Sequence, residues 1–512
     1  MHVMLVAAEN DALPNCKVGG VADVIRDVPD ALAELGLRVS VITPDYGQAA
    51  LERELIADIA VPFRQHLETA TLWQVGQSPA VTQYVLSHSL FSEHGGAIYC
   101  NDQHQPFATD ASRFAFFAAA VAEVIEHQVI ADIDVVHLHD WHAAVISVLR
   151  RFSPRFKRLK TLTTVYTVHN LALQGVRPFK GDHSSLEAWF PTLTYDGLPI
   201  CDPHHPHCFN PMRAAVNLSD KVHVVSPNYA KEVMMTSHPE LGFFGGEGLE
   251  SDMQHAAHEG RLVGILNGCV YPSDDTTTVK PSFTDYLNLA EQHVLQWMAK
   301  SKQLLSKFYI AHRRILAWQQ QPFTGHLITS VGRLTEQKAL ILRQPTKTGV
   351  VLDDLAMLAT EKQARLILVG SGDEQLEQLF SEVMSRHDNL LFLNGYGQAL
   401  GEQLYQLGDL FLMPSSFEPC GISQMLAMRE GQPCIVHQVG GLADTVKDKQ
   451  TGYCFSGESL AEQGSELIVT FQMALNDLCN NNEAYQRLSD AARNQRFDWH
   501  SSAQQYLQKL YQ

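Results

Sequence analysis

The sequence has few charged side chains, and basic ones are in the minority. Charged residues make up 18% of the 512 residues, and 38 lysines and arginines face 56 aspartates and glutamates. The formal net charge of −18 repels phosphate backbones and argues against nucleic acid as a partner. A small basic pocket for one phosphorylated ligand remains compatible with this charge.

Long apolar runs and a disulfide framework are also missing. No stretch approaches the roughly 20 uninterrupted apolar residues that cross a bilayer, so we expect no membrane partner. The apolar start, Met1 to Glu9, is short, has no basic leader and is interpreted as a buried strand instead of a signal peptide. Nine cysteines, an odd number spread from Cys16 to Cys479, favour a reducing compartment. We therefore expect a cytoplasmic protein.

Short apolar runs alternate with amphipathic stretches along the whole chain. The run 3–8 is followed by a helical stripe over 21–35, which Pro29 interrupts, and by a second run at 38–43. Such an order forms right-handed crossovers in a parallel sheet, and a chain this long needs at least two cores. We predict an α/β protein with two Rossmann-like, doubly wound domains. Further strands are expected at 134–139, 164–168 and 221–225, and then at 326–331, 365–369, 390–393, 410–413 and 433–436.

The polar, turn-rich stretch 273–285 separates the two series of strands. We place one domain at 1–270 and the second at 271–495. The last stretch, Ser501 to Gln512, has the pattern of a short amphipathic helix, and 496–512 is assigned to it.

Ligands of parallel sheets bind beyond the carboxyl ends of the strands, so the loops there were considered first. Lys17-Val18-Gly19-Gly20 places two glycines and a lysine before a helix, which suits an anion. A glycine turn beside a surface lysine is the alternative. His139-Asp140-Trp141-His142 suits a polyhydroxylated ring, since an aromatic can stack on it and a carboxylate can accept from its hydroxyls. The alternative is that these residues cap the next helix. His169, at another strand end, is catalytic or simply buried.

Two loops of the second series have the chemistry of a phosphate site. Arg333 and Lys338 follow its first strand and suit a departing diphosphate; two solvated cations are the alternative. The segment 414–424 presents Glu418, and Gly421-Ile422-Ser423 opens a helix whose free N–H groups suit phosphate oxygens.

Four other motifs are interpreted mainly as structural. Asp132-Ile133-Asp134 precedes its strand, at the wrong end for a ligand. The segment from Cys201 to Cys208 contains three histidines, so zinc is an alternative, but its spacing matches no usual zinc template. The turn 370–373 follows a strand, and 346–349 imitates a phosphate loop without a clear strand before it.

Together the loops resemble the bacterial glycogen synthase and plant starch synthase family. The matching pieces follow the family order over nearly the whole chain: Lys17-Val18-Gly19-Gly20-Val21-Ala22-Asp23-Val24, His137-Leu138-His139-Asp140-Trp141-His142, Thr167-Val168-His169-Asn170-Leu171, Val225-Ser226-Pro227, Gly264-Ile265-Leu266-Asn267-Gly268, Gly332-Arg333-Leu334-Thr335-Glu336-Gln337-Lys338, Phe417-Glu418-Pro419-Cys420-Gly421 and Gly440-Gly441-Leu442-Ala443-Asp444-Thr445-Val446.

The resemblance implies the glycosyltransferase B fold, with the active site in a cleft between two domains. It implies transfer of glucose from ADP-glucose to the non-reducing 4-hydroxyl of an α-1,4-glucan, with retention of configuration and without a metal or other cofactor. The substrates ADP-glucose and glucan are then the partners. The terminal helix resembles the family's crossover helix, which packs back on the first domain.

By matching motif, the resemblance also implies the role of each residue. Lys17 and the backbone of Gly19 and Gly20 meet the donor near its diphosphate. The glucose is held by Asp140, His169 and Asn267. Arg333 and Lys338 stabilise the leaving diphosphate, together with the N–H groups of Gly421, Ile422 and Ser423. Glu418 contacts the sugar and steadies developing positive charge, and Tyr396 stacks on the base.

The sequence departs from the family pattern at several positions. Val18 replaces a threonine, Ser416 an arginine, Ala339 a glycine and Glu402 a histidine, and Cys269-Val270-Tyr271-Pro272 replaces a segment with Ile-Asp and a tryptophan. Two other functions therefore stay open. One is a transferase of the same fold that uses UDP-glucose or another acceptor, and the other is a glucan- or nucleotide-binding protein without catalysis.

Overall fold

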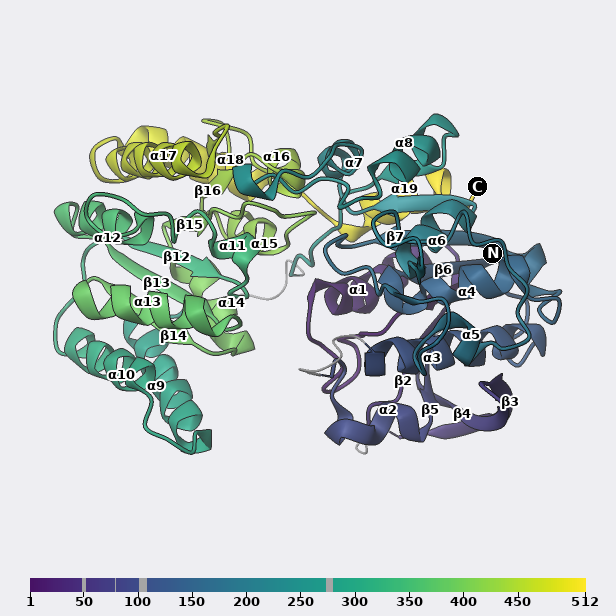
Figure 1. Cartoon of the computed structure of the whole chain (residues 1–512). Helices are drawn as coiled ribbons and strands as arrows, with labels where there is room; N and C mark the ends of the chain where they lie inside the picture. The colour runs from purple at the N-terminus through teal and green to yellow at the C-terminus, as the bar shows by residue number, and fades with distance from the viewer. Residues whose placement is uncertain (48–51, 79, 101–107, 273–279) are drawn as a thin grey trace. The chain divides into compact units, whose positions relative to one another are not determined.

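A computed structural model describes residues 1–47, 52–78, 80–100, 108–272 and 280–512. Its contacts group into two units (Figure 1). The first unit comprises Met1–Ser237, Gly245–Val270 and Asp498–Gln512, and the second comprises His238–Phe244 and Tyr271–Phe497. The short segment 238–244 thus groups with the second unit, which nothing in its composition indicates.

The first unit is built on a nine-stranded sheet with the order β11-β10-β7-β6-β1-β2-β5-β4-β3. Strands β11 to β5 in this order run parallel, and β4 and β3 are added antiparallel at one edge. The strands predicted near 3, 38, 134, 164 and 221 are confirmed, whereas β3, β4, β5 and β11 were not predicted. The bounds are β1 His2–Val6, β2 Arg38–Pro44, β3 Glu54–Phe63, β4 His66–Gln77, β5 Val81–Ser87, β6 Val135–His139, β7 Thr163–Val168, β10 Lys221–Val224 and β11 Leu262–Gly264; β8 Arg177–Pro178 and β9 Cys208–Phe209 form a separate pair.

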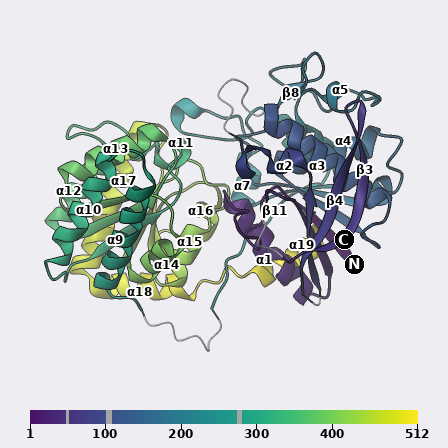
Figure 2. The same ribbon diagram turned by 90° about the horizontal axis from the view of Figure 1, so that it is seen from below.

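Helices cover both faces of this sheet. α1 and α19 lie on one side of it and α3 and α4 on the other (Figure 2). The predicted stripe is confirmed, because Val24, Ile25, Val28 and Leu32 are buried on α1 and pack with β1 and α19; Pro29 stays inside α1. The bounds are α1 Gly20–Glu34, α2 Ser89–Ser92, α3 Ala108–Glu126, α4 Asp140–Phe152, α5 Leu186–Trp189, α6 Pro211–Leu218, α7 Pro227–Glu232, α8 Glu250–His258 and α19 Trp499–Lys509, with short 3-10 turns at Glu93–Gly96 and Leu159–Thr161.

The last helix differs from its prediction over 501–512. α19 begins at Trp499 because the side chain of Asp498 caps it, accepting from the N–H of Ser501 at 2.8 Å. It ends at Lys509, and Leu510 and Tyr511 follow as buried residues outside the helix. The helix groups with the first unit.

The second unit is built on a six-stranded, fully parallel sheet with the order β14-β13-β12-β15-β16-β17. α17 and α18 lie on one side of it and α9 and α10 on the other (Figure 1). All five predicted strands are confirmed, and β17 is additional. The bounds are β12 Leu327–Val331, β13 Arg365–Gly370, β14 Leu390–Asn394, β15 Leu410–Met413, β16 Cys434–His437 and β17 Gly452–Phe455; α9 Phe283–Lys300, α10 Ser306–Gln319, α11 Glu336–Ala339, α12 Val351–Glu361, α13 Glu374–Arg386, α14 Gln398–Leu407, α15 Ser423–Arg429, α16 Gly440–Thr445, α17 Leu460–Asn480 and α18 Asn482–Asn494, with a 3-10 turn at Pro239–Leu241.

Two motifs interpreted as structural have the expected local roles. The carboxylate of Asp134 accepts from the N–H of His2 at 2.7 Å, which ties β6 to β1. Asp373, in the turn after β13, caps α13 by accepting from two backbone N–H groups. Across the described residues, none of the helices has the length and apolar character needed to cross a membrane.

Candidate active site

The predicted site residues divide between the two units, and most lie just beyond the carboxyl ends of parallel strands. We call Lys17, Gly19, Gly20, Asp140, His169 and Asn267 the first-unit site, and Arg333, Lys338, Tyr396, Glu418, Gly421, Ile422 and Ser423 the second-unit site. Each is described separately.

In the first-unit site, an acid that the sequence did not single out already occupies the glycine loop. The backbone N–H groups of Val18 and Gly19 donate to one carboxylate oxygen of buried Glu9, at 2.7 and 2.6 Å. The N–H of Gly20, at the start of α1, has no acceptor among the described residues. The loop therefore binds a carboxylate of the chain itself, Glu9, and its contact with a donor diphosphate stays a prediction.

Two carboxylates hold the Lys17 ammonium beside this loop. Its Nζ lies 3.0 Å from Asp11 and 2.6 Å from Asp23. Burial opposes the charge on Lys17, but the contacts with Asp23 and Asp11 outweigh it and raise the pKa. Lys17 is thus a preorganised cation, and its charge is partly neutralised.

Asp140 and His169 are brought together, as the sequence predicted. Asp140 follows β6 and His169 follows the neighbouring β7, and the Asp140 carboxylate accepts from the backbone N–H of His169 at 2.7 Å. Asp140 adopts a φ of 54°, a left-handed conformation that costs a non-glycine residue free energy and is often found at functional sites. Burial raises the pKa of Asp140 to about 7, and Glu9 adds to this effect.

Five histidines are buried around these residues, and all are neutral. Burial lowers the pKa of His142 and His169 to about 3, that of His223 to about 4, and those of His137 and His139 well below the usual range. Sequence reasoning grouped His139 and His142 in one motif and considered His169 alone; the spacing of His137 and His139 along one strand was a further signal that these two share a face.

Two of these histidines, His137 and His223, belong to a chain of five polar groups that we call the buried histidine network: Tyr511, His137, Thr167, His223 and the carbonyl of Ile265. The carbonyl can only accept, so Nε2 of His223, at 3.2 Å, carries the hydrogen. Nδ1 of neutral His223 then accepts from the Thr167 hydroxyl at 2.9 Å, and Thr167 accepts from Nε2 of His137. Nδ1 of His137 must accept, so the Tyr511 hydroxyl donates to it at 2.8 Å. The position of every hydrogen in the network therefore follows from the Ile265 carbonyl, which can only accept.

The loop that carries Asn267 is clamped by α19. The Ser502 hydroxyl donates to the carbonyl of Leu266 at 2.7 Å, and a Cβ on Gly268 would lie 2.6 Å from the backbone nitrogen of Trp499. Asn267 itself is buried, and its Oδ1 has no hydrogen-bond partner in the described part of the chain. A buried unpartnered amide oxygen is costly, so it is a candidate to accept from a ligand hydroxyl.

The prediction that Trp141 offers a stacking surface is wrong for this structure. Its side chain is 4% exposed and packs edge-on against Phe114, beside His142. A Cβ on Gly175 would lie 2.4 Å from the indole, so this glycine makes room for the ring. Trp141 is a core residue that supports the start of α4, and the apolar packing explains its burial.

In the second-unit site, two cations line one cavity. Arg333 and Lys338, together with Gly332, Pro414 and Ser415, border a cavity of about 40 Å³ at the ends of β12 and β15. Arg333 is exposed, and no carboxylate in the described residues forms an ion pair with it. Its guanidinium is therefore available to a ligand.

Lys338 and Glu418 form an ion pair. Nζ of Lys338 lies 3.0 Å from the Glu418 carboxylate, which also accepts from the Ser415 hydroxyl at 3.3 Å. Glu418 is 8% exposed, and these two contacts give its buried carboxylate polar partners. The pair places one cation and one carboxylate on the same edge of the sheet, as predicted.

Two neighbouring elements hold the Glu418 loop in place. Gly440 has a φ of 44°, and a Cβ there would lie 2.0 Å from the Glu418 carbonyl, so only glycine fits. The N–H of Gly441 donates to the same carbonyl at 3.0 Å. His437, whose pKa burial lowers to about 4, donates from Nδ1 to the carbonyl of Ser415 at 3.2 Å. His437 was not predicted as a site residue.

The remaining second-unit residues are arranged more openly. Gly421, with a φ of 75°, and Ile422 lead into α15, which begins at Ser423; none of the side chains that the structure describes caps this end. Tyr396 is 69% exposed after β14. Of the departures from the family pattern, Ser416 is buried with an unpartnered hydroxyl, Ala339 is buried in α11, and Glu402 is exposed and accepts from Gln398.

The segment from Cys201 to Cys208 forms a hairpin in which Asp202 accepts from the backbone N–H groups of His204 and His205. Among the described residues, no three His, Cys, Asp or Glu side chains are grouped so that they could hold a metal ion.

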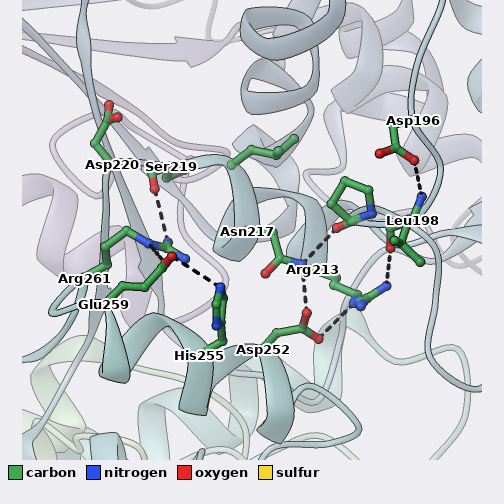
Figure 3. Close-up of a pocket in the computed structure, with 12 residues that line it drawn as sticks. Asp196, Leu198, Arg213, Asn217, Ser219, Asp220, Asp252, His255, Glu259 and Arg261 are labelled. Atoms are coloured by element: carbon green, nitrogen blue, oxygen red, sulfur yellow. Dashed lines mark hydrogen bonds and ion pairs between the residues drawn. The ribbon is translucent and has the colours of Figure 1, made fainter.

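A larger depression of the first unit contains none of the predicted residues. It has a volume of about 700 Å³ and lies between α6, α8 and the start of β11 (Figure 3). Both of its arginines are paired with carboxylates of the same depression: Arg213 with Asp252 at 2.9 Å and Arg261 with Glu259 at 2.6 Å. The loops at the strand ends differ from this depression, because among the described residues Arg333 has no ion-pair partner and Asn267 Oδ1 has no hydrogen-bond partner.

The two sets of residues suit two kinds of chemistry. The first-unit site offers neutral imidazoles, an amide oxygen and a carboxyl group with a pKa of about 7, which suit the hydroxyls of a neutral ligand. The second-unit site offers an unpaired guanidinium and an ammonium, which suit an anion.

Comparison with known proteins gives consistent matches over the length of the chain. Residues 2–255 match the family model of the starch synthase catalytic domain, and residues 319–495 match that of glycosyl transferases group 1. The chain is 31% identical to a glycogen synthase of Exiguobacterium sibiricum, over 98% of this chain and 97% of that protein. It is 32% identical to a glycogen synthase of Streptococcus sanguinis, over 100% and 99%. The catalytic domain of starch synthase IV from Arabidopsis thaliana, solved with ADP and acarbose, superposes with a TM-score of 0.76 at 25% identity, over 100% of this chain and 98% of that one.

Proposed function

Because the chain belongs to the glycogen synthase family, we propose that it transfers glucose from ADP-glucose to the non-reducing 4-hydroxyl of an α-1,4-glucan. The configuration at the transferred carbon is retained, and ADP is released. The bound ADP of the Arabidopsis starch synthase supports an adenine nucleotide.

The observation that carries the proposal is the charge arrangement of the second-unit site. As the bond between glucose and diphosphate breaks, negative charge grows on the diphosphate and positive charge on the sugar. Arg333 and Lys338 line one cavity and stabilise the diphosphate, while the Glu418 carboxylate, 3.0 Å from Lys338, steadies the sugar. Such preorganised charges are among the largest contributions to enzymatic rate.

The first-unit site binds the glucose in this proposal. Asn267 Oδ1 and the Asp140 carboxylate accept from hydroxyls, and His169 provides one more polar contact. Lys17 exchanges one of its two carboxylate partners for the donor's phosphate. The Gly20 N–H is free for the same anion, whereas that of Gly19 must first release Glu9.

We further propose that no metal takes part and that the protein acts in the cytoplasm. Two cations and the N–H groups before α15 supply the positive charge that a metal would otherwise provide. All nine cysteines, Cys16 to Cys479, are free thiols, which is compatible with a reducing compartment.

The experiment is a comparison of radiolabelled ADP-glucose and UDP-glucose as donors, with glycogen as acceptor and a chelator present. We expect incorporation from ADP-glucose, unchanged by the chelator. Faster incorporation from UDP-glucose would identify UDP-glucose as the donor. Loss of activity with chelator would contradict the metal-free mechanism. ADP binding without incorporation from either donor would identify a binding protein that has lost catalysis.

A further inference from the structure

Two histidine rings contact each other directly behind the first-unit site. His139 ends β6 and His169 follows β7, and these strands pair in parallel. Nδ1 of His139 lies 2.9 Å from Nε2 of His169, and the rings are 29° from parallel. His139 was interpreted from the sequence only as part of a motif, with no role of its own.

One hydrogen must lie between these two nitrogens. Burial keeps both rings neutral, and a neutral imidazole has one N–H donor and one bare nitrogen. At 2.9 Å the contact is a hydrogen bond, so one ring donates and the other accepts. The direction decides which nitrogen of His169 carries its hydrogen.

The surroundings of His139 favour one direction. Its other nitrogen, Nε2, is fully enclosed and has no partner among the described residues. If Nδ1 of His139 accepted, its hydrogen would sit on Nε2 as a buried, unpaired N–H, and such orphaned donors are rarer in proteins than orphaned acceptors. If Nδ1 donates, only a bare nitrogen is enclosed.

The opposite nitrogen of His169 faces a different environment. Nδ1 of His169 has no hydrogen-bond partner in the described chain, yet it is absent from the fully enclosed, unpartnered atoms, so solvent reaches it. A hydrogen on this nitrogen can therefore be satisfied by water or by a ligand.

We propose that His139 is a positioning residue: it donates from Nδ1 to Nε2 of His169 and holds His169 with its hydrogen on Nδ1. His169 then presents a donor, not an acceptor, to the ligand. This deepens the proposed function, because it makes a lone pair of a sugar oxygen the group that His169 recognises.

The packing keeps His139 in place for this task. Its ring stacks on His137 with 4.5 Å between centroids and 25° between planes. His137 is itself held on both nitrogens by the buried histidine network. On the other side, Asp140 fixes the backbone of His169 through its 2.7 Å hydrogen bond. The His139 ring therefore lies between two anchored residues.

The direct test is the tautomer of His169, measured in the full chain with histidine-selective ¹⁵N labelling and long-range ¹H–¹⁵N correlation. The His169→Gln variant assigns the signal. We expect the Nδ1–H pattern for His169, and a shift toward the Nε2–H pattern in His139→Leu. A hydrogen on Nε2 of His169 in the unmodified protein, or an unchanged tautomer in His139→Leu, would overturn the proposal.

Two matched substitutions separate positioning from packing. The Asn amide reaches the place of the imidazole Nδ1, whereas the Gln amide reaches that of Nε2. We expect His139→Asn to keep the Nδ1–H tautomer and to stay within about threefold of the original kcat, and His139→Gln to lose about 10- to 100-fold. Equal losses in both variants would favour a merely structural role. His88→Leu, in a partly buried histidine packed on Phe116, is the control for loss of a ring in the same unit.

The tautomer can be read whether or not the enzyme is active. If the protein transfers no glucose but His169 shows the Nδ1–H pattern, the proposed function fails and the positioning role stands. If transfer is normal and the tautomer is Nε2–H, the proposed function stands and the positioning role fails.

Discussion

The first-unit and second-unit sites achieve selectivity in opposite ways. Around Asp140 and His169, titratable groups are buried, and burial keeps five histidines neutral and raises the pKa of the acid to about 7. In the second unit, Arg333 is exposed, and Lys338 and Glu418 balance each other's charge. A neutral, hydroxylated ligand is best recognised by uncharged groups shielded from water, and an anion by fixed cations. In the proposed function, burial is therefore the means of recognition in one unit and charge in the other.

The largest expected difference between the units is their response to acid. His142, His169 and His223 bind a proton at pH 3 to 4 in the folded state but at the usual 6.5 when unfolded. Below pH 6.5 the unfolded chain therefore binds more protons than the folded chain. The free energy of unfolding falls as the pH drops from 6.5 toward 4. Together, three such groups lower the free energy of unfolding by about 4 kcal/mol per pH unit.

Hydrogen exchange at pH 7.5 and 5.0, corrected for intrinsic rates, checks this prediction. We expect amides of β6, β7 and β10 to lose protection and those of β12, β13 and β15 to keep most of it. In the second unit, His437 is the described histidine whose pKa burial lowers, to about 4. Equal loss of protection in both units would contradict the comparison.

Removing a charge from the second-unit site is expected to have the next largest effect. Lys338→Ala or Glu418→Ala breaks the 3.0 Å pair and, in the proposed function, leaves the diphosphate or the sugar without its partner. We expect turnover to fall about 100- to 1,000-fold while the fold is kept, as measured by glucan elongation and circular dichroism. Arg343→Ala, which breaks an exposed pair with Glu336, is the control and should be near normal. Near-normal turnover in the first two variants would remove the proposed site.

In the first-unit site, removing a charge is expected to stabilise the protein. Burial raises the folded-state pKa of Asp140 from 3.8 to about 7. Between these values the unfolded chain is ionised and the folded one is not, so stability falls as the pH rises and the whole cost is present above pH 7. Asp140→Asn, whose amide oxygen can still accept from His169, should gain about 1–4 kcal/mol at pH 8 and almost nothing at pH 4. It should also lose activity. Thermal unfolding at both pH values measures this, and a destabilised variant at pH 8 would show that Asp140 is ionised at no cost.

The smallest expected effect comes from the end of the buried histidine network. Tyr511→Phe removes the hydroxyl that donates to His137 and leaves Nδ1 of that ring unpartnered. We expect a loss of about 1–2 kcal/mol in the free energy of unfolding, measured with urea. Tyr309→Phe, at a residue 52% exposed in the second unit, is the control. An unchanged midpoint for Tyr511→Phe would mean that water takes the place of the hydroxyl.

Much of the parallel fold could be predicted because a buried strand appears in the local sequence as a short apolar run. The runs at 326–331 and 390–393 are apolar and bounded by polar turns, and both became strands. Strands β3 and β4 were not predicted because they form an antiparallel hairpin at the sheet edge, where exposed polar residues interrupt the apolar run. The start of α19 also depended on the Asp498 side chain, a cap that apolar periodicity does not reveal.

The sequence named residues of the candidate site but did not indicate the contacts that they make. Lys338 and Glu418 were named from their loops, and their ion pair agrees with the shared location. Glu9 was missed because its partners are backbone N–H groups, which every sequence contains. The contact between His137 and Tyr511 spans 374 positions, so no local pattern could indicate it.

The clamp of α19 on the Asn267 loop bears on how the protein is made. The core around β1 contains Val3 and Leu5 from the start of the chain and Trp499 and Tyr506 from its last helix. The ribosome makes the second unit after the first strands and before α19, and this takes on the order of tens of seconds. During that time the first sheet has one face without α19. The second unit, whose main segment is continuous, can mature first, and the first unit is completed only as the final residues emerge.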